Sequence, residues 1–393
     1  MILQLLAAAQ MLLASAVAIG PPDDAFYQPP SPLPHAKHGD VIWARPLVVG
    51  AALPHAAANW LVLYHSVSPR GEDTAVSGTV AIPQGTPPPG GWRVISWAHG
   101  TTGNGPQCTP STYRRLDGEQ RLMDSFVSQG YAVVQTDYEG QSTPGIHPYF
   151  VGESYSHDLA DAVRAARQID SSIGPNWVVM GHSEGGDAAL WAAAGSPGWT
   201  PELQLRGAVA YAPGSNIEGF FQQMLQQNEP SGSFPLFALM LQSFGTYEPG
   251  VHLGEILTPE MQQLLPDLQK MCDGELRAKP AWSSIVPSHI FKRNAPLQPL
   301  IDAFVRNDPS NLQIRVPVLL IQGSSDTIVP QDLTSDLRAA LCSNGATLWY
   351  DVFRATNHAT VLPTSFAQAL PWVGDRFAAV RARTNCRTAP QVY

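Results

Sequence analysis

Residues 177–194 read WVVMGHSEGGDAALWAAA. Four apolar residues, typical of a short buried strand, lead into the pattern Gly-x-Ser-x-Gly, and the alanine-rich stretch after it favours a helix. A serine on such a strand-to-helix turn projects beyond the end of the sheet, while the flanking glycines permit strained backbone and close packing. The start of the helix also favours negative charge beside the serine. We therefore predict that Ser183 is a nucleophile; the alternative is a purely structural glycine turn.

Short apolar runs and amphipathic stretches alternate on both sides of this turn. Residues 60–68 and 74–82 alternate apolar and polar side chains, which predicts an antiparallel pair of strands at the start of the fold. Further strands are predicted at 94–98, 132–136, 177–180, 208–211, 316–321 and 347–352, and helices at 157–169, 186–194, 333–341 and 364–379. Because strands that alternate with helices form a mostly parallel central sheet with helices on both faces, the predicted fold class is α/β. The proline-rich residues 23–57 lack periodicity and are expected to wrap the surface.

One interval departs from this alternation. About a hundred residues between 211 and 316 contain no comparable strand run but carry helical patterns at 216–227, 259–271 and 296–306. We interpret residues 214–314 as an inserted helical cap, which divides the core into residues 21–213 and 315–393.

Composition limits the classes of protein that remain. A chain of 393 residues is too long for a small disulfide-stapled domain, and 44% hydrophobic residues exclude global disorder. Charged residues make up only 14%, against roughly 25% in an average soluble protein. The formal net charge is −9 and no basic run occurs, which argues against nucleic acid as a partner.

Residues 1–20 have the features of a secretory signal peptide. This stretch is uncharged and mostly apolar, and residues 16–18 match the small-x-small pattern of a cleavage site. No lysine or arginine precedes the apolar run, so an uncleaved anchor is the alternative. Elsewhere no uncharged stretch approaches the ~20 residues that a membrane span needs. We expect a secreted, extracellular protein with no integral membrane span after signal removal.

The chain contains four cysteines: Cys108, Cys272, Cys342 and Cys386. An even number in an exported chain indicates two disulfides, for which three connectivities are possible; free buried thiols are the alternative. No CxxC motif or Cys/His cluster occurs, so the sequence predicts no metal site.

A serine nucleophile needs a base to accept its proton and an acid to orient that base. In the α/β-hydrolase arrangement both partners follow the serine, the acid before the histidine. Only three histidines follow Ser183, and two of them, His252 and His289, fall in the cap interval. The third, His358, follows the predicted strand 347–352, so its loop can lean back over the serine. His358 is therefore the predicted base.

Asp326 is the predicted acid, because it comes directly after the most apolar strand, 316–321. A carboxylate at that strand end lies on the same sheet edge as the serine and can accept the imidazole N–H. Three rivals are less suitable. Asp332 and Asp336 lie at a helix start, where acids serve as caps, and Asp351 lies inside a strand pattern.

Acyl transfer also needs donors for an oxyanion. The backbone N–H of Glu184, directly after the nucleophile, is one predicted donor. The loop after strand 94–98 is expected to supply the other, from Thr101 with Thr102 as the alternative. His99 is expected to buttress this loop. Residues 137–140 end at the same sheet edge, and we favour a structural role for them over a place in the pocket.

Several segments of the chain match a known family. They are 24–30 (DAFYQPP), 77–80 (SGTV), 98–103 (AHGTTG), 138–140 (YEG), 181–183 (GHS) and 357–358 (NH). With these segments the chain resembles the secretory lipases of the α/β-hydrolase superfamily, the Candida antarctica lipase A-like group. The resemblance implies hydrolysis of triacylglycerols or other carboxylic esters and a helical cap between the sixth and seventh core strands. It also implies the disulfides Cys342–Cys386 and Cys108–Cys272.

The cap contains strongly apolar segments. Phe220, Phe221, Met224 and Leu225 recur at helical spacing, and residues 234–241 are almost wholly apolar. Packing inside the cap is the simpler interpretation. The alternative is an acyl-binding tunnel or a mobile lid that works at a lipid–water interface.

We therefore expect a secreted serine ester hydrolase of the lipase type that takes a small-molecule or lipid ester and uses no metal or organic cofactor. The alternatives are a carboxylesterase for short-chain, acetylated or polymeric esters, a secreted peptidase, and a catalytically silent binding protein. The intact Ser183, Asp326 and His358 argue against the last. Glu184 departs from the family pattern, in which glutamine is common at this position. Its carboxylate is a candidate for raising the pKa of His358. No pattern indicates an oligomeric state.

Overall fold

A computed structural model of the chain describes residues 17–48 and 50–393. The predicted signal peptide, residues 1–20, lies mostly outside the described residues. Within the part of the chain that is described, no helix is both long and apolar enough to cross a membrane.

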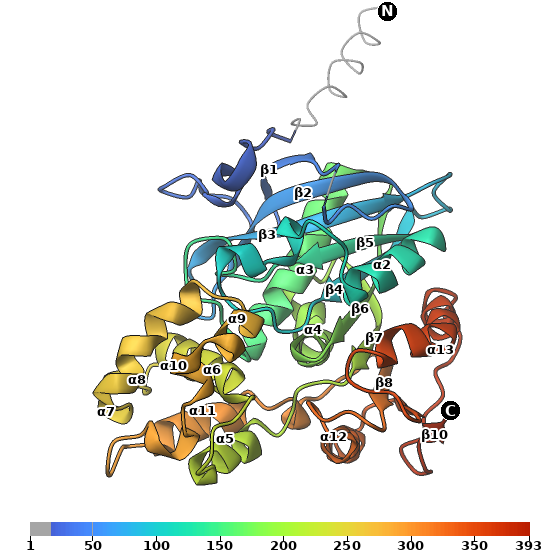
Figure 1. Ribbon diagram of the computed structural model, residues 1–393. Helices are drawn as coiled ribbons and strands as arrows, with labels where there is room; N and C mark the ends of the chain where they lie inside the picture. The colour runs from blue at the N-terminus through green and yellow to red at the C-terminus, as the bar shows by residue number, and fades with distance from the viewer. Residues whose placement is uncertain (1–16, 49) are drawn as a thin grey trace, which may run out of the picture.

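The described residues contain one ten-stranded sheet in the order β1-β2-β3-β5-β4-β6-β7-β8-β9-β10 (Figure 1). β1, β2, β3 and β5 pair antiparallel, and every pairing from β5 through β4 to β10 is parallel. The strands are β1 (Val41–Pro46), β2 (Ala56–Val67), β3 (Asp73–Pro83), β4 (Trp92–Ala98), β5 (Tyr131–Thr136), β6 (Ile173–His182), β7 (Gln204–Tyr211), β8 (Val318–Gly323), β9 (Leu348–Phe353) and β10 (Gln391–Val392). The parallel part of the sheet confirms the predicted α/β class.

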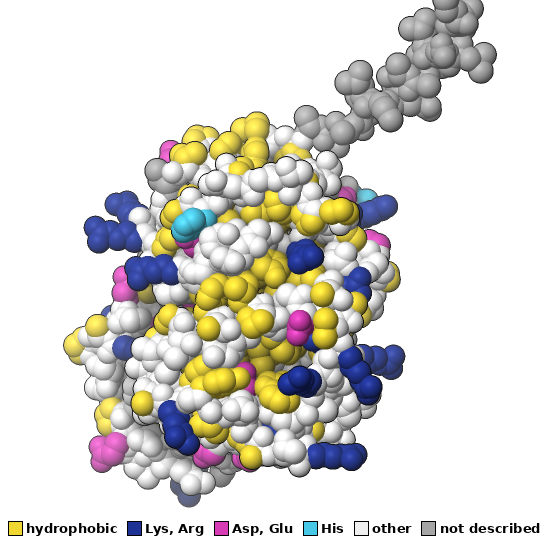
Figure 2. All heavy atoms as spheres, turned by 90° about the vertical axis from the view of Figure 1, so that its right-hand side faces the viewer, with side chains coloured by type: hydrophobic (Ala, Val, Ile, Leu, Met, Phe, Trp, Pro, Cys, Tyr) yellow, Lys and Arg dark blue, Asp and Glu magenta, His cyan; other side chains and the backbone are white. Residues whose placement is uncertain are grey.

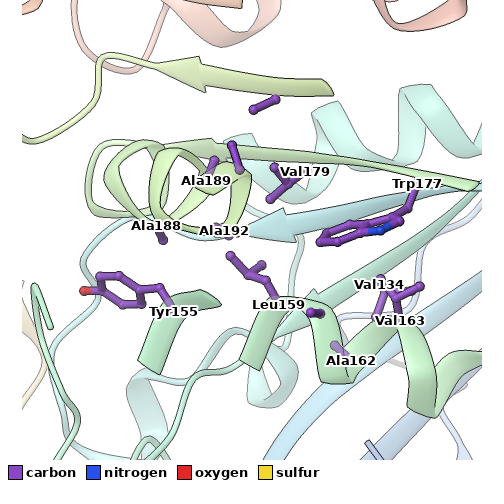
Figure 3. Close-up of a cluster of buried hydrophobic side chains, with 14 of the residues drawn as sticks. Val134, Tyr155, Leu159, Ala162, Val163, Trp177, Val179, Ala188, Ala189 and Ala192 are labelled. Atoms are coloured by element: carbon purple, nitrogen blue, oxygen red, sulfur yellow. The ribbon is translucent and has the colours of Figure 1, made fainter. Parts of the chain in front are cut away.

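Helices cover both faces of the sheet. They are α2 (Gly118–Ser128), α3 (Gly152–Ile169), α4 (Glu184–Trp199), α12 (Gln331–Ser343) and α13 (Val361–Phe377). Side chains alternate across each strand, so Val94 of β4 packs with α3 and α4 while its neighbour Ile95 packs with α2 and α13. Figure 3 shows the first of these layers, in which Ala188 and Ala192 of α4 lie opposite Tyr155 and Leu159 of α3. The small alanines let the two helices approach each other and the sheet closely.

A second group of helices lies between β7 and β8 in the chain and is gathered on one side of the core in Figure 1. They are α5 (Ile217–Gln226), α6 (Phe234–Tyr247), α7 (Leu253–Ile256), α8 (Pro259–Leu264), α9 (Asp273–Ala278), α10 (Pro280–Ser283) and α11 (Gln298–Arg306). These helices share a hydrophobic cluster of their own, built around Phe221, Phe237, Trp282 and Phe304. Most of the apolar side chains in this segment therefore pack against one another.

The structure differs from the sequence-based expectation in three elements. Residues 23–57 contain β1, an edge strand whose only fully buried residue is Ala44, so its sequence lacks the usual alternation. The helix expected over 259–271 is broken into α8 and a 3₁₀ helix at Leu265–Gln269, because Pro266 cannot donate the next helical hydrogen bond. The helix α2 was not expected at all, although Asp117 and Gln120 form a capping box at its start.

Two disulfides tie distant segments to this frame. One joins Cys108, in the loop after β4, to Cys272 at the start of α9, with the two Cα atoms 5.3 Å apart. The other joins Cys342 of α12 to Cys386 near the C-terminus, with a Cα separation of 5.6 Å. The pairing is the one that the family resemblance implies.

Candidate active site

Ser183 lies on a strained turn between β6 and α4, with φ of 58° and ψ of −117°. Hydrogen bonds fix this conformation, since the Ser183 N–H donates to the Tyr211 carbonyl over 2.9 Å and its carbonyl accepts from Gly186 over 3.0 Å. Both glycines of the motif are required here. A Cβ at Gly181 would overlap the carbonyl of Gly185, and a Cβ at Gly185 would overlap the carbonyl of Ala98. A strained, half-buried serine at a helix start is the arrangement expected of a nucleophile.

Asp326 and His358 form a hydrogen-bonded pair at the same edge of the sheet. The Nδ1 atom of His358 lies 2.7 Å from Oδ2 of Asp326, whose side chain is fully buried. The other carboxylate oxygen accepts the backbone N–H groups of Ile328 and Val329, over 2.8 and 2.9 Å. Asp326 follows β8 and His358 follows β9, so the loops at two neighbouring strand ends bring them together.

The pair has shifted pKa values. Burial raises the pKa of Asp326, but the hydrogen bond and charge of His358 and two backbone amides outweigh burial and hold the pKa below its ordinary value. Burial lowers the pKa of His358, and although Asp326 opposes this shift, the charge of His182 adds to it. The imidazole of His358 is therefore neutral near pH 7 and able to accept a proton.

The rival residues lie elsewhere. Asp332 and Asp336 lie on α12, and Asp351 accepts a hydrogen bond from Trp349 Nε1 over 2.7 Å. His252 precedes α7 and His289 belongs to a 3₁₀ helix, both in the helical segment between β7 and β8.

The nucleophile and the histidine loop are linked through His182, the residue before Ser183. Its Nε2 donates to the carbonyl oxygen of His358 over 2.9 Å, and the two imidazole rings lie 4.5 Å apart, centre to centre. The predicted nucleophile, acid and base thus come from the ends of β6, β8 and β9.

The predicted oxyanion donors also lie at this edge. Thr101 and Glu184 line the same cavity as Ser183. Among the described residues, neither of their backbone N–H groups donates a hydrogen bond to a protein acceptor. The Thr101 hydroxyl lies 2.7 Å from the Tyr149 hydroxyl, which fixes the loop from the side of α3. The carbonyl of Thr102 accepts the N–H of Asp273, so this residue ties the loop to α9.

The Glu184 side chain points away from His358. Its carboxylate is buried and accepts hydrogen bonds from His147 Nε2 over 2.8 Å and from the Tyr155 hydroxyl over 3.0 Å. The largest effects of charged groups on the pKa of His358 come from Asp326, His182 and Glu119. The hypothesis that Glu184 raises the pKa of His358 finds no support in this geometry.

The cavity at Ser183 has a volume of about 110 Å³. Phe220 of α5 and Leu236 and Met240 of α6 line it from the helical segment, and Val329 and Leu333 line it from the core. Its walls are mostly apolar. The polar groups come from Ser183, from the predicted oxyanion donors Thr101 and Glu184, and from Tyr149, Ser215 and Ser233. Such a pocket suits an uncharged substrate with an apolar arm.

The other predicted positions have structural roles. His99 Nδ1 lies 2.8 Å from the carbonyl of Gly100, and the Tyr138 hydroxyl donates to the His99 carbonyl over 2.9 Å, so both brace the oxyanion loop. Asp137 accepts from Ser77 over 2.7 Å and does not line the cavity. Across the described ranges, no group of three or more His, Cys, Asp or Glu side chains is arranged to hold a metal ion.

Sequence reasoning missed Glu119, His182 and Tyr149. Glu119 lies in the first turn of α2 and accepts a hydrogen bond from His182 over 2.9 Å. The capping box of Asp117 and Gln120 was the available signal for α2, but nothing local indicates which segments its glutamate contacts.

Comparison with known proteins agrees with this geometry. The chain matches the secretory lipase family over residues 115–385. It is 24% identical over 402 residues to "Lipase A" of Arthroderma benhamiae, a match that covers 96% of this chain and 84% of the relative. It is also 24% identical to a "probable inactive lipase" of Mycobacterium tuberculosis, with 91% of this chain and 82% of the relative covered. The structure of Candida antarctica lipase A in its closed state is 17% identical, with a TM-score of 0.78 over 96% of this chain and 91% of that chain. That likeness confirms the α/β-hydrolase fold.

Proposed function

The chain belongs to the secretory lipase family, and from this membership and the site geometry we propose that it hydrolyses carboxylic esters through Ser183, His358 and Asp326. The family match, over residues 115–385, contains all three residues. One named relative is described as inactive, so the assignment of the triad rests on the geometry of this chain rather than on the family alone.

Each member of the proposed triad has one role. Ser183 Oγ attacks the ester carbonyl carbon, and His358 accepts the serine proton and then donates it to the leaving alcohol. The 2.7 Å hydrogen bond to Asp326 holds the hydrogen on Nδ1, which leaves Nε2 as the basic nitrogen. Water then attacks the acyl-enzyme with His358 again as base, which releases the acid and restores Ser183.

The backbone N–H groups of Thr101 and Glu184 are the proposed donors to the tetrahedral oxyanion. Both residues line the cavity beside Ser183, and no protein acceptor within residues 17–48 and 50–393 uses their amides. Removing one such donor costs about 10²–10³ in kcat in other acyl-transfer enzymes.

The observation that carries the proposal is the combination of a strained Ser183, at φ 58°, with a buried Asp326–His358 pair at the same sheet edge. The test is ester hydrolysis by Ser183→Ala, together with mass spectrometry after treatment with a fluorophosphonate. We expect loss of hydrolysis in the variant and a single adduct, on Ser183, in the natural protein. Ser125→Ala, on the exposed side of α2, is the matched control and should keep full activity. Hydrolysis that survives in Ser183→Ala would reject the proposal.

The cavity volume favours a second candidate, a carboxylesterase for short acyl chains. Ligand pockets usually measure about 300–1,000 Å³, whereas the cavity at Ser183 measures about 110 Å³. A long acyl chain therefore requires α5 and α6 to move, while a short one does not. Rates on p-nitrophenyl esters from acetate to palmitate and on emulsified triolein separate the two. A rate that peaks at acetate or butyrate, with no gain on the emulsion, would favour the esterase.

We also propose that the enzyme acts outside the cell. Two disulfides close loops in the described chain, and such bonds persist in oxidising compartments. The helical segment 214–314 is then the part that sets substrate specificity, because four of its side chains, two from α5 and two from α6, line the cavity.

A further inference from the structure

A single carboxylate, that of Glu119, receives hydrogen bonds from three donor groups in different parts of the site. Oε2 accepts Trp97 Nε1 over 2.9 Å, and Oε1 accepts the backbone N–H of Gly100 over 3.1 Å and His182 Nδ1 over 2.9 Å. Trp97 is the second-last residue of β4, Gly100 precedes the oxyanion residue Thr101, and His182 precedes the nucleophile. Glu119 therefore fixes the position of the oxyanion loop relative to the turn that carries Ser183.

His182 extends this contact to the base. Its second ring nitrogen, Nε2, donates to the backbone carbonyl of His358 over 2.9 Å. The side chains of His182 and Glu119 are only 8% and 12% exposed, so water competes weakly for these bonds. Glu119 and His182 thus reach the backbone of His358, whereas Asp326 contacts its imidazole.

We propose that Glu119 and His182 are positioning residues, which together set the spacing of the oxyanion loop, the nucleophile and the base. This inference rests on the proposed triad. Neither side chain lines the cavity, so they act through Gly100, Ser183 and the backbone of His358.

The chemistry of the pair suits this role. All three partners of Glu119 are N–H donors, so an ionised carboxylate satisfies them and an amide does not. The hydrogen bond and charge of His182 offset the burial of Glu119 and lower its pKa. A neutral imidazole has one N–H, so His182 donates to both Glu119 and the His358 carbonyl only when both ring nitrogens carry hydrogen.

The charge arrangement predicts an effect that loss of packing would not produce. The charged groups facing His358 are Asp326 from the β8 loop, His182 from β6 and Glu119 from α2. His182 lowers the pKa of His358, while Asp326 and Glu119 raise it. Removing His182 alone leaves both carboxylates in place, so the pKa of His358 rises.

The experiment compares Glu119→Gln, His182→Asn and the double variant with the natural protein on p-nitrophenyl butyrate. A displacement of about 1 Å at reacting groups can cost 10²-fold, so we expect kcat to fall about 10–100-fold with KM nearly unchanged. In His182→Asn the acidic limb of the kcat/KM profile should also move to higher pH, since that limb reports the free-enzyme base. The double variant should be no worse than the poorer single variant, because the two residues act as one unit.

The matched control is Asp124→Asn on the same helix. Asp124 accepts His55 Nδ1 over 2.7 Å, and since its partner is an exposed histidine outside the site, its loss should leave kcat and the pH profile unchanged. Either single variant with kcat within twofold of the natural protein, or His182→Asn with a lower kcat but an unmoved acidic limb, would overturn the inference. If His182→Asn does not fold, Glu119→Gln and its kcat decide the question. These outcomes are separate from the proposed ester hydrolysis through Ser183, which Ser183→Ala tests on its own.

Discussion

Replacing Asp326 with asparagine changes one atom of the proposed triad and reverses the direction of a hydrogen bond. One oxygen of Asp326 accepts the N–H groups of Ile328 and Val329, and the other faces His358 Nδ1. The side-chain oxygen of the new amide is held by the two backbone donors, so its NH₂ group must face His358. The imidazole then accepts at Nδ1 and carries its hydrogen on Nε2, where it cannot take the proton of Ser183.

The magnitude follows from this change of tautomer. Converting the acid of a Ser-His-Asp triad to its amide lowers kcat by about 10⁴-fold, equivalent to about 5.5 kcal/mol of activation free energy. Asp326 is remote from bound substrate, so KM should change little. The fold should survive, because the two backbone hydrogen bonds to Ile328 and Val329 remain.

Initial rates on p-nitrophenyl butyrate at pH 7 to 9 measure this loss, with circular dichroism to verify the fold. Asp332→Asn is the control, since this exposed carboxylate at the start of α12 accepts only the N–H of Leu333. We expect the control to retain at least half of the activity. More than a tenth of the natural rate in a folded Asp326→Asn, or an equal loss in Asp332→Asn, would refute the assignment of the acid.

Three other changes test separate parts of the structure. Tyr149→Phe removes the 2.7 Å hydrogen bond to Thr101. At about 1 kcal/mol per hydrogen bond, kcat/KM should fall about fivefold. An unchanged kcat/KM would show that the loop of Thr101 does not need this hydrogen bond. Cys342→Ser with Cys386→Ser opens a loop of 44 residues, which should lower the free energy of unfolding by about 4 kcal/mol in urea titrations; a loss below 1 kcal/mol would contradict this. Burial raises the pKa of Glu139 to about 8, so the native state holds a proton that the unfolded chain has lost above its ordinary pKa of about 4.3. The free energy of unfolding should therefore fall as the pH rises from 5 to 8, and Glu139→Gln should flatten this dependence in thermal melts at each pH.

The placement of Ser183, Asp326 and His358 at the ends of parallel strands could be predicted because chain order and strand ends carry the information. A parallel sheet brings the carboxyl ends of its strands to one edge, so a serine, an aspartate and a histidine that each follow a strand are brought together. The pattern from Gly181 to Gly185 is equally local, because a side chain at either glycine would overlap a nearby carbonyl oxygen. For such residues the prediction needs only strand positions accurate to one or two residues.

Glu119 could not be predicted in the same way. Its partners Trp97, Gly100 and His182 come from two other segments of the chain, and their convergence depends on how α2 packs against the sheet. The same holds for Tyr149, whose hydroxyl reaches Thr101 across 48 positions of sequence. Hydrogen bonds between side chains of distant segments leave no periodic trace in the sequence.

Most of the formal net charge of −9 comes from acidic side chains that are buried. Nine of the 32 acidic side chains are buried, against one of the 23 basic side chains, which leaves 23 acidic and 22 basic side chains exposed or half-buried. Burial also raises the pKa of several of the buried acids, among them Asp187 and Asp158, the latter to about 7. Figure 2 agrees, because charged side chains of both signs are scattered over the face that it shows. Net charge alone therefore says little about partners at the surface of this protein. Since a nearly neutral exterior gives little long-range steering, it suits the uncharged esters that the apolar cavity at Ser183 accommodates.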